Sequence, residues 1–331
     1  MKTLPIAHTL SSVVIGSEVT FKNLVMFPLL RNPEPRNSAR SAKPRRLREN
    51  RAAPERTDWY QVLDDAIASG AVEVTEVSEQ GSVPELRVVN RGRKPTLIVD
   101  GEELVGAKQN RIVNLTILVA AQSELTIPVS CVEAGRWRAR SRAFAAAPRT
   151  QYATGRAKRM AQVTQSMQVS GLYYSDQAEV WSDIAHKAAQ LRSASPTGAM
   201  ESIFTDHAAS IDAFVSGLQP VDGQVGTVFA IGGRIVGFDL FDSASTLRKL
   251  LPKLVRSAAV EALDDDSGQA SLPGISFRSM CEQFLAAVGN VPTQTSPAVG
   301  MGEDVRLTAH GLTGAALIAD NKLVHLSAFA I

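Results

Sequence analysis

The chain has 331 residues, of which 44% are hydrophobic and 21% charged, with a formal net charge of +2, a composition typical of a globular protein with a sizeable core. Its two cysteines, Cys131 and Cys281, lie far apart and outside any Cys-x-x-Cys motif, which excludes a disulfide framework and a cysteine-based zinc site. The five histidines show no metal-ligand spacing, so the sequence predicts neither a metal site nor a cofactor.

Nothing in the sequence indicates a membrane or secreted protein. No stretch approaches the roughly 20 consecutive apolar residues of a membrane-spanning helix. The N-terminal stretch lacks the apolar region and small-residue cleavage site of a signal peptide. The expected location is therefore the cytoplasm.

The first half of the chain is predicted to be rich in strands. β-Branched and aromatic residues predict a strand over residues 19–30. Asp58 is expected to cap a short helix that ends at Gly70. Further strands are expected in four segments separated by Gly, Pro, Asn or a Gln-Ser pair: residues 86–90, 96–100, 111–120 and 124–132.

The second half begins with helices and returns to strands. Helices are expected over residues 156–169, 176–191, 197–218, 245–263 and 277–288. Strands are expected over residues 225–231, 234–240, 304–309, 314–320 and 322–329. Gly232-Gly233 and Asp320-Asn321 are predicted to form tight hairpin turns between them.

The expected fold class is α+β, with mostly antiparallel sheets formed by N- and C-terminal strands around a helical middle. Strands and helices do not alternate, and no Gly-x-Gly-x-x-Gly motif opens a helix, which excludes a Rossmann fold. Residues 1–331 are expected to form one integrated domain. Residues 31–56, rich in Arg and Pro, are predicted to be a basic, disordered insertion, and residues 264–275 a loop.

Positive charge is concentrated in two tracts. Residues 31–56 carry nine Lys or Arg and three Glu, a net of +6, and residues 133–159 carry eight and one, a net of +7. Since the whole chain has a net charge of +2, the remainder has −11. Such tracts either bind a polyanion, nucleic acid included, or pair with acidic residues of the same chain, and composition does not choose between these.

The densest polar segment covers residues 100–111, between two apolar strands. Asp100-Gly101 is typical of a type I′ turn, and the simplest interpretation of the next two glutamates is solvated charge. The density of polar groups favours a site instead, because Gly106-Ala107 would let a ligand approach the backbone, and the side chains that follow suit phosphate and ribose. We predict a catalytic role for Glu103 and ligand binding by Glu102, Lys108, Gln109, Asn110 and Arg111.

A second polar segment begins near the end of the last strand of this half. Cys131 is expected to be a buried, inert thiol, with a nucleophile as the alternative. Glu133 is a candidate for acid–base catalysis or ribose binding. Trp137 could stack a base while Arg136 binds phosphate, although an aromatic that caps the core beside solvated arginines is the alternative.

Asp239 is the last candidate for catalysis. It lies between Phe238 and Leu240 in a predicted strand, so its side chain points to the opposite face from theirs. That face is either a cleft or solvent.

Several short segments of the sequence resemble those of a known family. The most specific is Glu-Glu-Leu-Val-Gly-Ala-Lys-Gln-Asn-Arg at residues 102–111, and the others lie at residues 83–86, 128–133, 229–233 and 238–239. They resemble the ARG and rhodanese-phosphatase-superfamily-associated protein domain, a largely uncharacterised bacterial family, from about Gly16 to the C-terminus. The resemblance implies, through gene association with ADP-ribosylglycohydrolases and phosphatases, a role in NAD or ADP-ribose metabolism.

We therefore expect the protein to bind, and as an enzyme to process, an ADP-ribose-like or other nucleotide-derived metabolite. The sequence does not decide whether it is an enzyme; the expected reaction of an enzyme is hydrolysis of a glycosidic or phosphoester bond. One alternative is a non-enzymatic module that binds protein or nucleic acid through the basic tracts. Another is a structural accessory subunit with Trp137 buried against a partner. The oligomeric state does not follow from the sequence.

Overall fold

The computed structural model describes residues 5–32, 58–265 and 277–331. Within these ranges the fold is α+β with mostly antiparallel sheets, as the sequence predicts. The predicted insertion at residues 31–56 and the predicted loop at 264–275 lie almost entirely outside the described residues. None of the helices described is both long and apolar enough to cross a membrane.

The largest sheet has nine strands, taken from both ends of the chain and from its middle. Their order is β1-β3-β13-β14-β18-β17-β16-β15, and β2 pairs with β3. The strands are β1 (Val13–Ile15), β2 (Val19–Phe21), β3 (Leu24–Arg31), β13 (Gln224–Ile231), β14 (Arg234–Phe241), β15 (Thr293–Pro297), β16 (Glu303–Ala309), β17 (Leu312–Ala319) and β18 (Lys322–Ala330).

Two hairpin turns in this sheet confirm the predictions from their residues. Gly232 and Gly233 have φ angles of 53° and 79°, and Asp320 and Asn321 have φ angles of 50° and 58°. Positive φ at both central positions is the requirement of a type I′ turn, which Gly, Asn and Asp tolerate best. The turns join β13 to β14 and β17 to β18, with Ile231 opposite Arg234 and Ala319 opposite Lys322.

A second sheet of six strands curls on itself. Its order is β12-β8-β9-β11-β6-β5, and an isolated bridge between Thr75 of β5 and Ala143, next to β12, brings its two edges together. Its interior holds a separate apolar core. The strands are β5 (Val72–Glu76), β6 (Glu85–Asn90), β8 (Glu102–Gly106), β9 (Arg111–Val113), β11 (Ser123–Cys131) and β12 (Phe144–Thr150). A three-stranded sheet adds β4 (Gln61–Val62), β7 (Thr96–Ile98) and β10 (Ile117–Val119).

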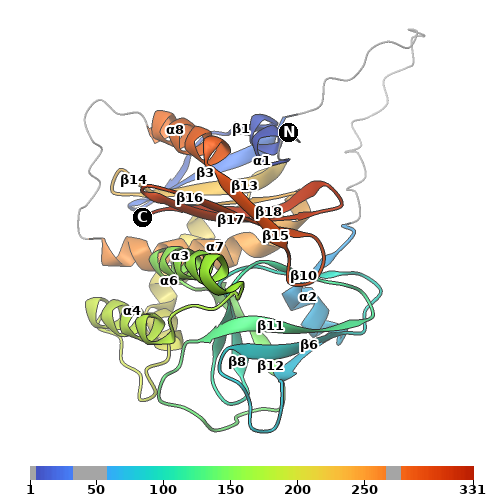
Figure 1. Cartoon of the computed structure of the whole chain (residues 1–331). Coiled ribbons are helices and arrows are strands. Elements are labelled where there is room, and N and C mark those ends of the chain that lie inside the picture. The colour runs from blue at the N-terminus through green and yellow to red at the C-terminus, as the bar shows by residue number, and fades with distance from the viewer. Residues whose placement is uncertain (1–4, 33–57, 266–276) are drawn as a thin grey trace, which may run out of the picture.

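The helices cover both faces of the nine-stranded sheet (Figure 1). On one face lie α1 (Pro5–Ser11) and α8 (Phe277–Asn290); on the other lie α3 (Ala153–Ser170) and α7 (Ala244–Asp264). Because α7 contacts both β13 and β12, it lies between the two large sheets, and one apolar core joins them there. The remaining helices are α2 (Leu63–Ala68), α4 (Gln177–Gln190), α5 (Glu201–Asp206) and α6 (Ala208–Gly217).

Two helix ends have typical caps, close to the bounds that the sequence predicts for these helices. The side chain of Asp176 accepts hydrogen bonds from the backbone N–H groups of Ala178 and Glu179 at the start of α4. Gly171 ends α3 in the left-handed conformation, with φ of 71°. Both residues satisfy backbone groups that the helix itself leaves unpaired.

The prediction of one strand over residues 111–120 is wrong. The segment forms β9 and β10, which belong to different sheets. Asn114 lies at the break, where its side chain donates to the carbonyl of Tyr173 at 2.9 Å and accepts from Ser130 at 2.6 Å. These contacts with distant parts of the chain replace the backbone ladder at this point.

Three other boundaries differ from the predictions. The helix expected after Asp58 begins at Leu63, and Asp58 instead accepts a hydrogen bond from Ser243, the N-cap of α7, at 2.5 Å. The helix expected over residues 197–218 is divided into α5 and α6 at His207, whose ring contacts the carbonyl of Leu191 at 2.8 Å. A turn at Lys22, with φ of 53°, divides the strand expected over residues 19–30.

Candidate functional site

The turn between β8 and β9 packs against the loop of residues 134–142. Gly106 and Ala107, at the start of this turn, have φ angles of 132° and 36°. A Cβ on Gly106 would lie 2.5 Å from Oγ of Ser141, and the same Oγ accepts the N–H of Ala107 at 2.9 Å. The small residues therefore admit the loop and not, as we predicted, a ligand.

Hydrogen bonds of Arg136 connect this loop to the β8–β9 turn. Its Nε donates to Oε2 of Glu133 at 2.8 Å, its Nη2 donates to Oδ1 of Asn110 at 3.1 Å, and three backbone carbonyls of the loop and the turn accept its other N–H groups. These contacts occupy all five N–H groups of the guanidinium. Phosphate binding by Arg136 would therefore require internal hydrogen bonds to break.

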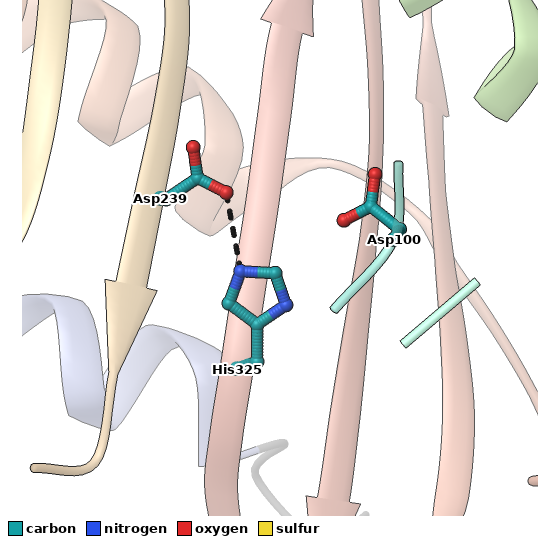
Figure 2. Close-up of side chains that lie close together, drawn as sticks. All are labelled: Asp100, Asp239 and His325. Atoms are coloured by element: carbon teal, nitrogen blue, oxygen red, sulfur yellow. Dashed lines mark hydrogen bonds and ion pairs between the residues drawn. The ribbon is translucent and has the colours of Figure 1, made fainter. Parts of the chain in front are cut away.

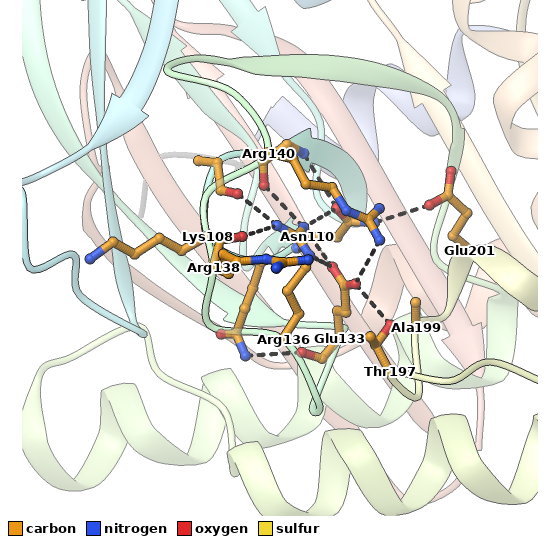
Figure 3. A network of polar contacts seen from close by, with 12 residues as sticks. Lys108, Asn110, Glu133, Arg136, Arg138, Arg140, Thr197, Ala199 and Glu201 are labelled. Atoms are coloured by element: carbon orange, nitrogen blue, oxygen red, sulfur yellow. Dashed lines mark hydrogen bonds and ion pairs between the residues drawn. The ribbon is translucent and has the colours of Figure 1, made fainter.

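Carboxylates and arginines lie close together around Asn110, among them Glu133, Glu201 and Arg136 (Figure 3). Glu103 of β8 is fully buried and pairs with Nε of Arg149 at 2.5 Å, while Nη2 of Arg149 lies 3.2 Å from Glu201. The amide nitrogen of Asn110 contacts both carboxylates at 3.4 Å. Burial raises the pKa of Glu103, although the charge of Arg149 opposes this shift.

Glu133 is the third carboxylate of this cluster. It accepts hydrogen bonds from Thr197 at 2.9 Å and from the backbone N–H of Asn110 at 3.2 Å, in addition to Arg136. Burial opposes its ionisation, but the hydrogen bonds from Arg136 and Thr197 outweigh burial and lower its pKa. Glu133 is therefore held as a carboxylate by its neighbours.

Arg111 differs from these arginines in lacking a carboxylate partner among the residues described. Its side chain is 0% exposed, and Nη1 donates to Oε1 of Gln109 at 3.0 Å and to the carbonyl of Asn110 at 3.5 Å. Its Nε and Nη2 are buried without a hydrogen-bond partner in the described part of the chain. Burial lowers the pKa of Arg111, since the charged form loses its hydration.

Trp137 covers this guanidinium and is itself half exposed. Its ring centre lies 5.7 Å from Cζ of Arg111 and 5.3 Å from Nζ of Lys108, and the residue is 50% exposed. The amine of Lys108 also donates to the carbonyls of Glu79 and Gln80. Lys108 and the exposed part of Trp137 therefore meet at the surface, above the buried guanidinium of Arg111.

Glu76, which the sequence analysis missed, lies beside these residues. Its Oε1 accepts the backbone N–H of Lys108 at 3.2 Å, whereas its Oε2 is buried and has no hydrogen-bond partner within the described ranges. The charge of Glu76 acts on Arg111. The sequence around Glu76 does not show that this residue lies beside Arg111 and Lys108. A glutamate at the end of a strand is common on solvated sheet edges, so nothing local distinguishes this one.

Cys131 is buried, as expected. Its Sγ accepts the backbone N–H of Glu133 at 3.4 Å, and burial raises the pKa of the thiol. A raised pKa disfavours the thiolate, which is the nucleophilic form. The geometry therefore supports the inert interpretation of this residue over the nucleophile.

Glu102 lies on the opposite side of β8 from Glu103. Its Oε1 accepts from Nζ of Lys253 of α7 at 2.6 Å, and its Oε2 accepts the backbone N–H of Val99 at 2.8 Å. It is 1% exposed. The simplest interpretation of the sequence, that both glutamates are solvated charges, is therefore wrong. Glu102 also lies away from Arg111.

The turn before β8 also differs from the prediction. Glu102 donates its N–H to the carbonyl of Val99 at 3.1 Å, so residues 99–102 form a turn, but positive φ occurs at Gly101 alone of its central residues, at 78°. This pattern is typical of a type II turn and not of type I′. Asp100 consequently points inward and is 1% exposed.

Asp239 and Asp100 belong to a second buried network, which also contains His325 (Figure 2). Nη2 of Arg156 donates to Asp100 at 3.0 Å and to Asp239 at 2.8 Å. Asp239 is 2% exposed and thus does not face solvent; with Arg156 and Phe329 it lines a small cavity. Within the described ranges, no side-chain hydrogen bond or ion pair joins this network to Arg111 or Glu103.

The three residues of Figure 2 have the composition of a metal site, since one ligand atom from each lies within 4.8 Å of the others. Arg156 pairs with both carboxylates, however, and both ring nitrogens of His325 have partners, Thr116 and Asp239. A cation would have to displace the guanidinium. The residues therefore do not fit a metal, and the network is a structural one.

This network predicts that the protein loses stability in acid. Burial opposes the ionisation of Asp100 and Asp239, but the charge of Arg156 outweighs it and holds the pKa of both below the usual range. A depressed folded-state pKa contributes stability above the unfolded-state value, near 4, and loses it as the pH falls further. Denaturant unfolding between pH 5 and pH 2.5 should therefore show stability falling with pH.

The matched measurement uses Asp239→Asn, which removes one of these groups. Each such group contributes up to about 1.4 kcal/mol per pH unit to the slope. The variant should be less stable at pH 7 and show a shallower dependence on pH. An unchanged slope would mean that other carboxylates cause the acid dependence.

The basic tract at residues 133–159 mostly pairs within the chain. Half of its eight cations are buried, namely Arg136, Arg149, Arg156 and Arg159. Lys158 pairs with Asp183 at 2.5 Å. The exposed remainder lies on the loop beside Trp137 and consists of Arg138, Arg140 and Arg142.

The structure thus divides the predicted site residues into groups. Around the loop and the β8–β9 turn lie Glu103, Lys108, Gln109, Asn110, Arg111, Glu133, Arg136 and Trp137. Cys131 is buried next to Glu133. Glu102 and Asp239 have their partners elsewhere.

Comparison with known proteins gives one match. Residues 12–329 match the model of the ARG and Rhodanese-Phosphatase-superfamily-associated Protein domain. Neither the curated proteins nor the solved structures contain a significant match.

Proposed function

We propose that this chain, which belongs to the ARG and Rhodanese-Phosphatase-superfamily-associated Protein family, binds a phosphate-bearing, nucleotide-derived metabolite of the ADP-ribose type. One observation carries the proposal. The buried guanidinium of Arg111 has two nitrogens without a partner in the described part of the chain, beneath a tryptophan that is 50% exposed.

Energetics favour an anion at Arg111. Removal of a guanidinium from water costs free energy that a carboxylate normally offsets, as Glu133 does for Arg136. An anionic ligand would supply the missing partner, and the planar guanidinium can donate two parallel hydrogen bonds to a phosphate. Lys108 adds a second positive charge nearby.

The aromatic ring distinguishes a nucleotide from a simple anion. A base can stack on the exposed face of Trp137, and such stacking contributes about 1 to 3 kcal/mol per base. The phosphate and the base of one ligand would thus contact adjacent residues. This combination supports a role in NAD or ADP-ribose metabolism.

The proposal concerns ligand binding and not catalysis. Glu103 and Glu133 are both 0% exposed and pair with arginines, so the geometry adds no argument for a reaction. Their catalytic roles, and the hydrolysis of a glycosidic or phosphoester bond, stay predictions.

Calorimetric titration with ADP-ribose and NAD tests the proposal. A bound base should also quench the fluorescence of Trp137, one of three tryptophans in the chain. Trp137→Phe should keep most of the affinity, because it retains an aromatic ring, and lose most of the fluorescence change. Trp181→Phe, which alters a tryptophan that is less exposed, is the matched control and should keep both.

Two outcomes would contradict the proposal. Folded protein that gives no heat with either ligand does not bind this class of metabolite. Binding that falls steeply with salt and is indifferent to Trp137→Ala, which removes the ring, would instead favour a polyanion, such as nucleic acid, on Arg138, Arg140 and Arg142.

A further inference from the structure

The carboxylate of Glu76 adds an acceptor to the donors of the proposed site. Its Oε2 is buried without a partner within the described residues, as are Nε and Nη2 of Arg111. Glu76 contacts Lys108, whose backbone N–H it accepts at 3.2 Å, and Lys108 and Arg111 both lie against the ring of Trp137, yet no ion pair joins Glu76 to Arg111 in the described part of the chain. Unused donors and an unused acceptor therefore lie near each other.

A glycine borders this carboxylate. Gly81 has φ of 77°, and a Cβ at this position would lie 3.2 Å from Oε2 of Glu76 and 3.2 Å from Cδ of Lys108. Any larger residue would therefore press on both side chains. Gly81 therefore packs closely against both side chains, and the carboxylate of Glu76 is held there with its Oε2 unpaired within the described residues.

We infer that Glu76 accepts a hydrogen bond from a sugar hydroxyl of the ligand, so that the site prefers sugar-linked phosphates to bare phosphate or pyrophosphate. The inference rests on the proposed function and specifies its substrate class. A carboxylate repels a phosphate group but accepts a hydrogen bond from a hydroxyl. In a nucleotide the sugar is joined to both base and phosphate, and Glu76 contacts Lys108, whose amine lies against the ring of Trp137.

The inference is testable because the carboxylate of Glu76 should attract a sugar hydroxyl and repel a phosphate group. Glu76→Gln removes the charge and keeps the size and the oxygen that can accept the N–H of Lys108. The variant should bind ADP-ribose about tenfold more weakly, because an ionised acceptor is lost. It should bind inorganic pyrophosphate as well as, or more tightly than, the wild type does.

Glu79→Gln is the matched control. Glu79 is an exposed glutamate on the same segment, so this variant removes an equal charge three residues away. It should leave the ratio of the two affinities unchanged. A thermal unfolding curve for each variant checks that the fold is retained.

The inference is wrong if Glu76→Gln changes both affinities by the same factor or leaves the affinity for ADP-ribose unchanged. A loss of thermal stability without a change in the affinity ratio would assign Glu76 to a water-bridged pair with Arg111. Failure of the proposed function is distinguishable, since the wild type would then bind neither ligand.

Discussion

Replacement of Arg156 by methionine is expected to lower the free energy of unfolding by about 3 to 5 kcal/mol. The guanidinium is 2% exposed and neutralises Asp100 and Asp239, which are equally buried. Without it, two carboxylates would remain in the interior, and Arg159 would still pair with Asp100. Since a domain is stable by about 5 to 15 kcal/mol, a large part of the total is affected. Urea unfolding at pH 7 measures the change.

Arg87→Met is the control for this substitution. Arg87 forms an ion pair with Glu124, but both side chains are about half exposed, and such pairs contribute at most about 1 kcal/mol. A second variant, Arg156→Met with Asp239→Asn, should recover part of the loss, because it removes one of the uncompensated charges. Equal stabilities for Arg156→Met and Arg87→Met would show that the network contributes little.

Replacement of Arg111 by methionine is expected to weaken binding of ADP-ribose by about 100-fold or more, which corresponds to about 2.7 kcal/mol. The substitution removes the donors that the proposal assigns to phosphate. Charged hydrogen bonds contribute about 1.5 to 3 kcal/mol each, so the loss of two suffices. Titration calorimetry on the folded variant measures the effect.

The free energy of unfolding should change much less in Arg111→Met than in Arg156→Met. Arg111 is buried without a carboxylate partner in the described ranges, so a methionine of similar volume should change the free energy of unfolding by less than about 1 kcal/mol. Arg111→Lys keeps the charge without the planar fork and should bind with intermediate affinity. A large loss of stability with unchanged binding would give Arg111 a structural role.

The sequence was a good guide to the fold wherever a local signal decides the structure. The turns at Gly232-Gly233 and Asp320-Asn321 need positive φ, and few residues tolerate it. The cap at Asp176 is equally local. The breaks at Asn114 and His207 were missed because each residue is fixed by contacts with another part of the chain.

The site was predicted only in part, for a reason that lies in strand geometry. Residues 102–111 form one string in the sequence, but alternate side chains of a strand face opposite sides. Glu103 therefore joins Asn110 and Arg149, whereas Glu102 meets Lys253. The string is continuous in sequence and divided in space.

The prediction for Asp100 failed for a different reason, namely that its partners are distant in the sequence. A local Asp-Gly pattern indicates a turn, and the turn exists, but nothing nearby in the sequence shows that Arg156 and Ser327 donate hydrogen bonds to this carboxylate. Its partners lie 56 and 227 residues away along the chain. Only the assembled sheets bring them together.

The position of β18 makes the nine-stranded sheet depend on contacts between distant parts of the chain. This strand lies in the interior of the sheet between β14 and β17, and it carries His325 and Ser327. Its pairing gives β14 a second neighbour and gives Asp239 one of its partners, His325, from 86 residues further along the chain. Such long-range pairing is slow to form. Docking of β18 into the sheet should therefore be a slow step of folding.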